Sequence, residues 1–260
     1  MNRGEAIRIV SLEPSVTAII AALGRLDCVV GVSPWCDGLV DVGDRPRLST
    51  TWCANAAEIT ALDPDLVIAS VPYRAEAVCE LLQAGLDLLC LYPQHLEDVF
   101  GHVTLLGRLT DAAAQAEQLV ADMQAKFSDI RARTRDLARP RVYVEVWNDP
   151  LMSAYPWVAD LVDIAGGQFV PPRPGRRVTE QEVLASEPQI IVVAWAGIAD
   201  PSPDQVCRRP GWDQLEAVRE GRVLAINEIL VNAPGPNLVE GARLLLACVH
   251  PEVADGGGSA

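Results

Sequence analysis

Short apolar runs alternate with longer amphipathic stretches along the first part of the chain. The apolar runs have strand length and occupy residues 7–12, 28–32, 66–69 and 86–91. Helix-length stretches fall between them, at residues 16–23, 54–61, 74–84 and 95–107. Strands that are apolar on both faces and separated by helices predict a parallel sheet with helices on both sides. Ser15 is the expected N-cap of the first helix, and Gly24 is its expected end.

The stretch 110–139 has a different pattern, because it contains neither Gly nor Pro. Apolar or neutral residues recur in steps of three and four, at Ala116, Leu119, Met123, Phe127, Ile130, Thr134 and Leu137. This spacing places one stripe on one helix face, and Pro140 ends it. The pattern predicts a single helix of roughly 45 Å at 1.5 Å per residue. An ordinary surface helix and a strut that connects two halves of the chain are both open interpretations.

The alternation of strands and helices starts again after this helix. A basic residue leads into a strand at 141–146, as it does at 8–12. The segment 182–194 parallels 58–69, since each combines a short helix, an acid–Pro turn and a buried strand. The chain is therefore expected to be an α/β protein of two Rossmann-like lobes with parallel sheets. The expected parts are an N-terminal lobe at 1–109, a connecting helix at 110–139, a C-terminal lobe at 140–254 and a flexible tail at 255–260.

Composition and charge narrow the classes of partner. Half of the 260 residues are hydrophobic and 22% are charged, which suits a packed core. The net charge of −14 argues against nucleic acid and anionic membrane surfaces, because binding to either needs a basic face. The longest apolar run, at 190–199, is too short to span a bilayer, so no direct membrane insertion is expected.

The start of the chain and its cysteines bear on the compartment. The first residues lack the apolar core of a signal peptide, and the seven cysteines show neither C-x-x-C nor zinc-finger spacing. These features predict a cytoplasmic protein. A mature secreted chain that has lost its leader would look similar, so a periplasmic or surface-anchored protein is the alternative.

Common catalytic and nucleotide-binding motifs are absent from the sequence. There is no G-x-G-x-x-G after the first strand, no P-loop, no H-E-x-x-H and no G-x-S-x-G. Accordingly, no bound nucleotide, no catalytic residue and no metal site is predicted. An enzyme acting on a tetrapyrrole or metal chelate stays open as an alternative, and its candidate groups are Cys36, Asp37, Glu13 and His95. Contact of Cys36 or Cys53 with a metal is also left open.

The positive signal is the placement of the tryptophans, which are six of only 13 aromatic residues. Aromatic side chains follow expected strands in both halves of the chain, at Trp35, Trp52, Tyr73, Trp147 and Trp195. Ligands of open parallel sheets bind at the carboxyl ends of the strands. Large rings there suit a large ligand with broad apolar faces, held in a cleft between the lobes. Glu13 and Ser15 fall at the same edge and could hold a polar group, whereas Trp157 and Trp212 are expected to be core residues.

Four segments resemble one known family. R-I-V-S-L-E-P-S-V-T, V-V-G-V-S-P-W-C-D, S-T-T-W-C-A-N-A-A-E-I and L-D-P-D-L-V-I-A are similar to segments of the cobalamin-binding members of the class III substrate-binding proteins of ABC importers. The resemblance implies two Rossmann-like lobes bridged by one long helix. It also implies that Trp35 and Trp52 contact a corrin ring, and that Glu58 docks on the transmembrane subunit of an importer.

The second lobe departs from the family pattern. Leu230 and Asn232 stand where the family has an aromatic residue and a second docking acid, and Glu228 is out of register. Docking to an ABC importer is therefore an open question, while the resemblance still implies non-catalytic binding of a corrinoid, cobalamin in the first place. The alternatives are a haem or siderophore in the same cleft. Loop arginines that would suit an anionic chelate are Arg45, Arg47, Arg173, Arg176 and Arg177.

Overall fold

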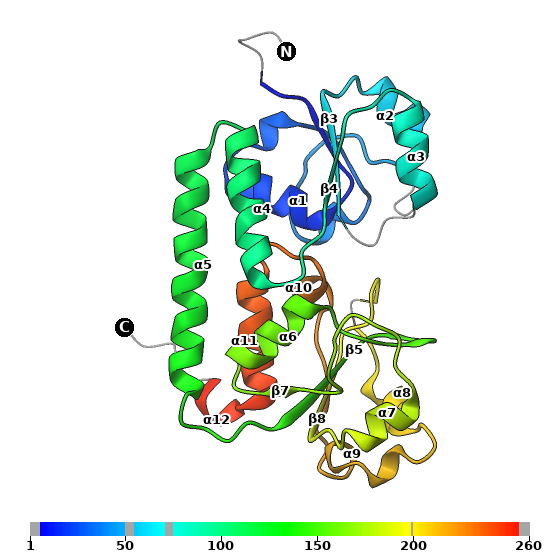
Figure 1. Ribbon diagram of the computed structural model, residues 1–260, viewed down its shortest axis with the longest axis vertical. Helices are drawn as coiled ribbons and strands as arrows, with labels where there is room; N and C mark the ends of the chain where they lie inside the picture. Colours follow the sequence, from blue (N-terminus) through cyan, green and yellow to red (C-terminus); the bar gives the residue numbers. More distant parts are fainter. Residues whose placement is uncertain (1–5, 50–54, 71–74, 199, 255–260) are drawn as a thin grey trace. The chain divides into compact units, whose positions relative to one another are not determined.

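The computed structural model of the protein describes residues 6–49, 55–70, 75–198 and 200–254 (Figure 1). The chain divides into two compact units. The first unit comprises the described residues up to Pro93 together with Glu97–Asp122. The second comprises Gln94–Leu96 and the described residues from Met123 onwards. Within the described residues, no helix combines the length and the apolar character that crossing a membrane requires.

The first unit contains a four-stranded parallel sheet of order β2-β1-β3-β4. Its strands are β1 (Ile9–Ser11), β2 (Val29–Val32), β3 (Leu66–Ser70) and β4 (Leu88–Leu91). Its helices are α1 (Pro14–Ala22), α2 (Ala56–Ala61), α3 (Ala75–Gln83) and α4 (Leu96–Leu109), with 3-10 turns at Leu26–Cys28 and Cys36–Gly38. Alternate residues of β3 join different core clusters, Ile68 with α1 and Val67 with α2 and α3, so both faces of the sheet are covered.

The second unit has a mixed sheet of order β6-β5-β8-β9, and β7 also pairs with β5. Its strands are β5 (Arg141–Asn148), β6 (Leu151–Ser153), β7 (Gln168–Phe169), β8 (Ile190–Val193) and β9 (Val223–Ala225). Its helices are α6 (Pro156–Ile164), α7 (Glu180–Ala185), α8 (Pro203–Cys207), α9 (Glu216–Arg219), α10 (Ile229–Asn232), α11 (Leu238–Val249) and α12 (Pro251–Ala254), with a 3-10 turn at Trp212–Gln214. All the pairs are parallel except β5–β6, because the two-residue connection 149–150 allows only a hairpin.

The two units repeat one topology. The order β2-β1-β3-β4 of the first sheet corresponds to β7-β5-β8-β9 in the second. In both units an arginine at the start of the first strand caps an acid–Pro turn. Nε of Arg8, just before β1, donates to the carbonyl oxygen of Asp63 at 2.8 Å, and Nε of Arg141, the first residue of β5, donates to that of Glu187 at 2.7 Å. Both acids adopt a left-handed backbone, with φ of 47° and 44°. The expected α/β class with a parallel-stranded core sheet in each lobe is confirmed, with β6 as an antiparallel addition.

The first helix begins earlier than its sequence indicated. Glu13 is the N-cap residue of α1 and Pro14 its first helical residue, so Ser15 lies inside the first turn and is not the cap. Proline suits the first helical position because its fixed φ is helical and its missing N–H would have no intrahelical partner. Gly24 follows the helix with φ of 71°, the conformation expected where the helix ends.

The helix expected at 110–139 is present as α5 (Ala113–Thr134), a shorter helix of about 33 Å. Thr110 directly follows α4, and its N–H still donates to the carbonyl oxygen of Leu106 at 3.0 Å. Asp111 has a φ of 53°, which breaks the helix before α5 begins. The expected stripe is buried at Ala116, Met123, Phe127, Ile130 and Thr134. The boundary between the units falls inside α5, after Asp122. The role of α5 as a strut that connects two halves of the chain stays a prediction.

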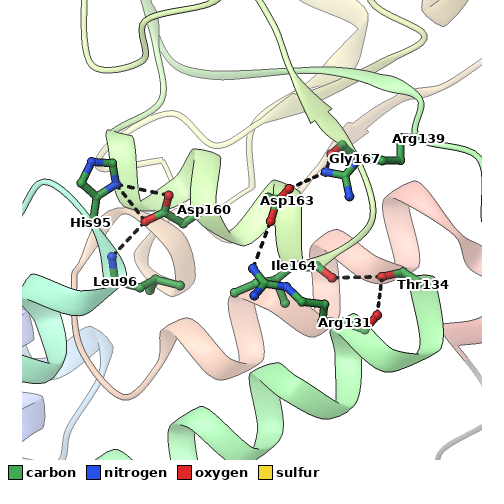
Figure 2. A network of polar contacts seen from close by, with 9 residues as sticks. All are labelled: His95, Leu96, Arg131, Thr134, Arg139, Asp160, Asp163, Ile164 and Gly167. Carbon is green, nitrogen blue, oxygen red and sulfur yellow. Dashed lines mark hydrogen bonds and ion pairs between the residues drawn. The ribbon is translucent and has the colours of Figure 1, made fainter. Parts of the chain in front are cut away.

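Polar contacts fasten the end of α5 to α6 within the second unit (Figure 2). The carboxylate of Asp163 pairs with the guanidinium groups of Arg131, at 3.0 Å, and Arg139. The hydroxyl of Thr134 donates to the carbonyl oxygen of Ile164 at 3.3 Å. The last turn of α5 is therefore fixed by ion pairs and hydrogen bonds as well as by its apolar stripe.

Asp160 of α6 also binds the segment that precedes α4 (Figure 2). Its Oδ2 accepts a hydrogen bond from the backbone N–H of Leu96 at 3.0 Å and lies 3.2 Å from Nδ1 of His95. A carboxylate at this position satisfies an N–H at the start of α4 that has no intrahelical partner. The ring of His95, an alternative catalytic candidate from the sequence, thus contacts the carboxylate that holds this helix start.

Candidate functional site

Trp35 lies beyond the carboxyl end of β2, as expected, and 46% of its surface is exposed. The loop that carries it is held in place. The guanidinium of Arg47 donates two hydrogen bonds to Asp37, of 2.8 and 2.7 Å, and the N–H of Leu48 returns to the carbonyl oxygen of Val32 at 2.9 Å. An aromatic ring on a fixed loop loses little entropy on binding, which suits a ligand contact.

Small polar side chains fill the interior below this loop. The hydroxyl of Thr17 lies 2.8 Å from that of Ser11 and 3.1 Å from the sulfur of Cys36, and Ser33 lies 3.3 Å from the same sulfur. Burial is the main cause that raises the pKa of the Cys36 thiol. A buried thiol with a raised pKa is a poor nucleophile. Cys36 is therefore a core residue and does not support the enzyme alternative.

The two polar candidates of the first strand–helix turn differ in exposure. Ser15 is buried in the first turn of α1, so it is not available at an open surface. Glu13 is half-buried, and its backbone carbonyl accepts the hydroxyl of Ser11 at 3.1 Å. The backbone of this turn is thus engaged in local hydrogen bonds. A contact between the side chain of Glu13 and a ligand stays a prediction.

Trp147 belongs to β5 itself, which continues to Asn148 and does not end at Val146 as its sequence indicated. The pairing with β6 extends the strand: Trp147 stands opposite Met152, after a register shift that follows Glu145. The indole is 42% exposed, and its N–H donates to the carbonyl oxygen of Asp149 at 2.8 Å. This hydrogen bond fixes the ring at the sheet edge and leaves its faces for apolar contact.

Trp195 lies in the core of the second unit and has only 2% of its surface exposed. Its indole N–H donates to Oε1 of the buried Glu145 at 2.9 Å. The same carboxylate receives both terminal nitrogens of Arg209 at 2.7 Å and the hydroxyl of Tyr143 at 3.1 Å. Trp195 is therefore packed as a core residue, because β8 delivers its ring to this buried carboxylate rather than to the surface. It has no part in the site proposed below.

The remaining aromatic candidates have different outcomes. Trp52 and Tyr73, like Cys53, lie outside the described residues. Trp157 and Trp212 are buried, which confirms the expectation that they are core residues. Of the candidate rings that the structure describes, Trp35 and Trp147 are exposed.

Glu58 is held at the start of α2. Asn55 caps this helix, and Oε2 of Glu58 accepts a hydrogen bond from the N–H of Ser49 at 2.9 Å. Hydrogen bonds from Ser49 lower the pKa of Glu58, so its carboxylate is kept charged. By contrast, burial raises the pKa of Glu228, which accepts from Gly197 at 3.1 Å and from Asn232 at 3.0 Å. Glu228 thus has a structural role in its own unit.

Most of the loop arginines have structural partners. Arg45 donates to the carbonyl oxygens of Leu26, Val29 and Val42, Arg47 pairs with Asp37, and Arg176 pairs with Glu182 at 2.8 Å. Arg173 and Arg177 are exposed. Within the described part of the chain, no group of three or more His, Cys, Asp or Glu side chains is arranged to hold a metal ion. Three of these five arginines are engaged by other groups and two are exposed, so they do not make a joint anion site.

Residues 9–230 match the family model described as "Periplasmic binding protein". The chain belongs to this family. Among relatives, it is 27% identical over 95% of its length to the ABC transporter substrate-binding lipoprotein YvrC of Bacillus subtilis, covering 81% of that protein. It is 26% identical over 95% of its length to a cobalamin-binding protein of Halobacterium salinarum, covering 70% of it. A periplasmic haem-binding protein of Pseudomonas aeruginosa has the same fold, with a TM-score of 0.83, 22% identity and coverage of 95% and 94% of the two chains.

Membership of the periplasmic binding protein family decides two of the expectations. A family of solute-binding proteins confirms non-catalytic binding over the enzyme alternative. The expected cytoplasmic location is wrong, because the family is described as periplasmic and the Bacillus relative is a lipoprotein. The prediction failed because it rested on the first residues of the chain, whereas the family resemblance runs through the folded part.

Proposed function

We propose that this periplasmic binding protein binds a corrinoid, cobalamin in the first place, outside the cytoplasm and supplies it to an ABC importer. The observation that carries the proposal is the pair of exposed indoles, Trp35 and Trp147, each at the carboxyl edge of the sheet of its own unit. Indole faces suit a large ligand whose faces are apolar. A relative named as cobalamin-binding and another named as an ABC transporter lipoprotein support the ligand and the transport role.

The partners of the loop arginines and the exposed rings together favour tetrapyrroles over siderophores as ligands. An anionic siderophore needs several cationic donors, but Arg45, Arg47 and Arg176 are already engaged by carbonyl oxygens or carboxylates. A tetrapyrrole needs broad apolar contact, which the two indoles offer. Corrinoid and haem therefore fit the exposed residues better than a siderophore does, and the name of the Halobacterium relative favours the corrinoid.

The proposal is tested by incubating the protein separately with cyanocobalamin, haem and a ferric catecholate siderophore. Each sample is desalted, and its visible absorption spectrum shows whether the chelate stays with the protein. We expect cyanocobalamin to be retained at one equivalent. Retention of haem or siderophore alone would contradict the corrinoid as the ligand, and retention of none of the three would contradict chelate binding.

We infer that Glu58 is a docking residue for the importer. Its carboxylate is ionised and positioned by Ser49 at the start of α2, so it can pair with a cationic side chain of a partner. The variant Glu58→Gln should weaken binding to the importer and leave the affinity for the chelate unchanged. Glu80→Gln, on the exposed face of α3, is the matched control. Equal importer binding by both variants would remove Glu58 from the interface.

A further inference from the structure

Trp147 is the first member of a row of three side chains at the edge of the second sheet. It stands opposite Met152 in the antiparallel β5–β6 pair. On the other side of β6, Met152 stands opposite Arg177 in an isolated antiparallel bridge. Residues directly opposite each other in antiparallel strands project their side chains to the same face, with Cβ atoms about 4.5–5.5 Å apart. An indole, a thioether and a guanidinium group therefore share one face.

The backbone holds this row in place. The N–H of Ser153 donates to the carbonyl oxygen of Arg176 at 3.0 Å, and the N–H of Val178 donates to that of Leu151 at 3.0 Å. These two bonds flank Met152 and Arg177, which makes them a non-hydrogen-bonded pair, the kind whose side chains come closest. Backbone hydrogen bonds thus tie the segment around Arg177 to β6, and the position of Arg177 relative to Trp147 is set by register.

Arg177 differs from its neighbour in its partners. The guanidinium of Arg176 pairs with Glu182 at 2.8 Å and donates to the carbonyl oxygen of Arg177 at 2.9 Å. The side chain of Arg177 is exposed, and its guanidinium has no hydrogen bond or ion pair with any residue that the structure describes. Among the described residues, therefore, this cation has no counter-ion, and it lies two positions across the ladder from an exposed aromatic ring.

We propose that Arg177 is a ligand-binding residue that holds an anionic group at the rim of the chelate while Trp147 and Met152 contact its apolar face. The proposal rests on the proposed function, because it assumes that Trp147 contacts the ligand. Guanidinium groups form strong, paired hydrogen bonds with phosphate and carboxylate oxygens. On a chain whose net charge is −14, a guanidinium beside an apolar face selects chelates that carry one such group.

The anionic group of a tetrapyrrole ligand can be a phosphodiester or a carboxylate. Two pairs of ligands, each with and without one of these groups, distinguish the two. Cobalamin carries a phosphodiester that cobinamide lacks, and haem carries carboxylates that its dimethyl ester lacks. Dissociation constants are measured for all four with the wild type and with Arg177→Gln. The matched control is Arg173→Gln, which removes the same charge from an exposed arginine of the preceding loop, outside the row.

We expect Arg177→Gln to weaken binding of the anionic member of the pair that the wild type prefers by roughly tenfold or more. Binding of the member without the anion should change little, and Arg173→Gln should behave as the wild type. Equal affinity of Arg177→Gln and wild type for the anionic ligand, or equal losses for both members of the pair, would overturn the role of Arg177. Failure of the wild type to bind any of the four would instead overturn the proposed function.

Discussion

Glu145 and Arg209 form a bidentate ion pair in the interior of the second unit, with both nitrogen–oxygen distances at 2.7 Å. Glu145 is completely buried. The pair joins β5 to the segment after α8, and its guanidinium stacks on the ring of Trp212, 4.6 Å from the centroid. Because the hydrogen bond from Trp195 ends on the same carboxylate, this pair also explains why Trp195 is a core residue.

Removal of one partner of this pair should destabilise the protein strongly. Glu145→Gln leaves the half-buried Arg209 without its counter-charge, which typically costs about 3–5 kcal/mol of the free energy of unfolding. Denaturant unfolding measures the change. Glu240→Gln, which breaks the exposed Glu240–Arg243 pair, is the control and should cost less than about 1 kcal/mol. Similar losses in both variants would show that the buried pair has no special role.

Trp195 should contribute to the stability of the fold and not to binding of the chelate. Trp195→Phe removes an N–H donor from a buried carboxylate, so we expect a loss of roughly 1.5–3 kcal/mol in stability with unchanged affinity for the chelate. Unfolding and ligand titration are carried out on the same preparation. A weakened affinity at unchanged stability would return Trp195 to the ligand site.

Two glycines of α4 offer a test of the packing of α4 on α5. A Cβ at Gly107 would lie 2.4 Å from the Cβ of Ala116, whereas a Cβ at Gly101 would meet no atom within 4 Å. Gly107→Ala should therefore lower stability by about 1–3 kcal/mol. Gly101→Ala should raise it by about 0.5–1 kcal/mol, because alanine is the better helix former. Thermal unfolding distinguishes them, and two changes of the same sign would disagree with this packing.

Glu182 should contribute to stability in a pH-dependent way. Arg176 and the N–H of Thr179 lower its pKa from 4.5 to about 2. Since the folded pKa is the lower one, the contribution is complete above pH 4.5 and is lost as the pH falls towards 2. The difference in Tm between wild type and Glu182→Gln should thus shrink over this range. Glu180→Gln, on the same helix, is the control. A difference that does not change with pH would exclude this linkage.

The helices and buried strands could be predicted because their patterns are local. The stripe from Ala116 to Thr134 follows the helical period, and its buried members match the expectation. The start of α5 could not be placed, because it depends on the left-handed backbone of Asp111 and on the hydrogen bond that ties Thr110 to the end of α4. Likewise, proline at position 14 starts α1 before the serine that looked like its cap.

The candidate site could be predicted only in part, because side-chain direction depends on distant partners. Trp147 and Trp195 both follow apolar runs, yet one is exposed and the other is buried. The difference arises from the hairpin that extends β5 and from Arg209, which is 64 residues from Glu145 in the sequence. The Met152–Arg177 bridge is an isolated pairing with β6, and no local sequence pattern indicated that these two residues are close.

The most direct test of the account is calorimetric titration of cyanocobalamin into wild type, Trp35→Ala, Trp147→Ala and Leu105→Ala. Leu105 is an exposed apolar residue of α4 and serves as the control. We predict one-to-one binding to the wild type, a Kd raised roughly 5–150-fold in each tryptophan variant, and no change in the control. Wild-type affinity in both tryptophan variants, or no binding by the wild type, would contradict the claim that these exposed indoles bind a corrinoid.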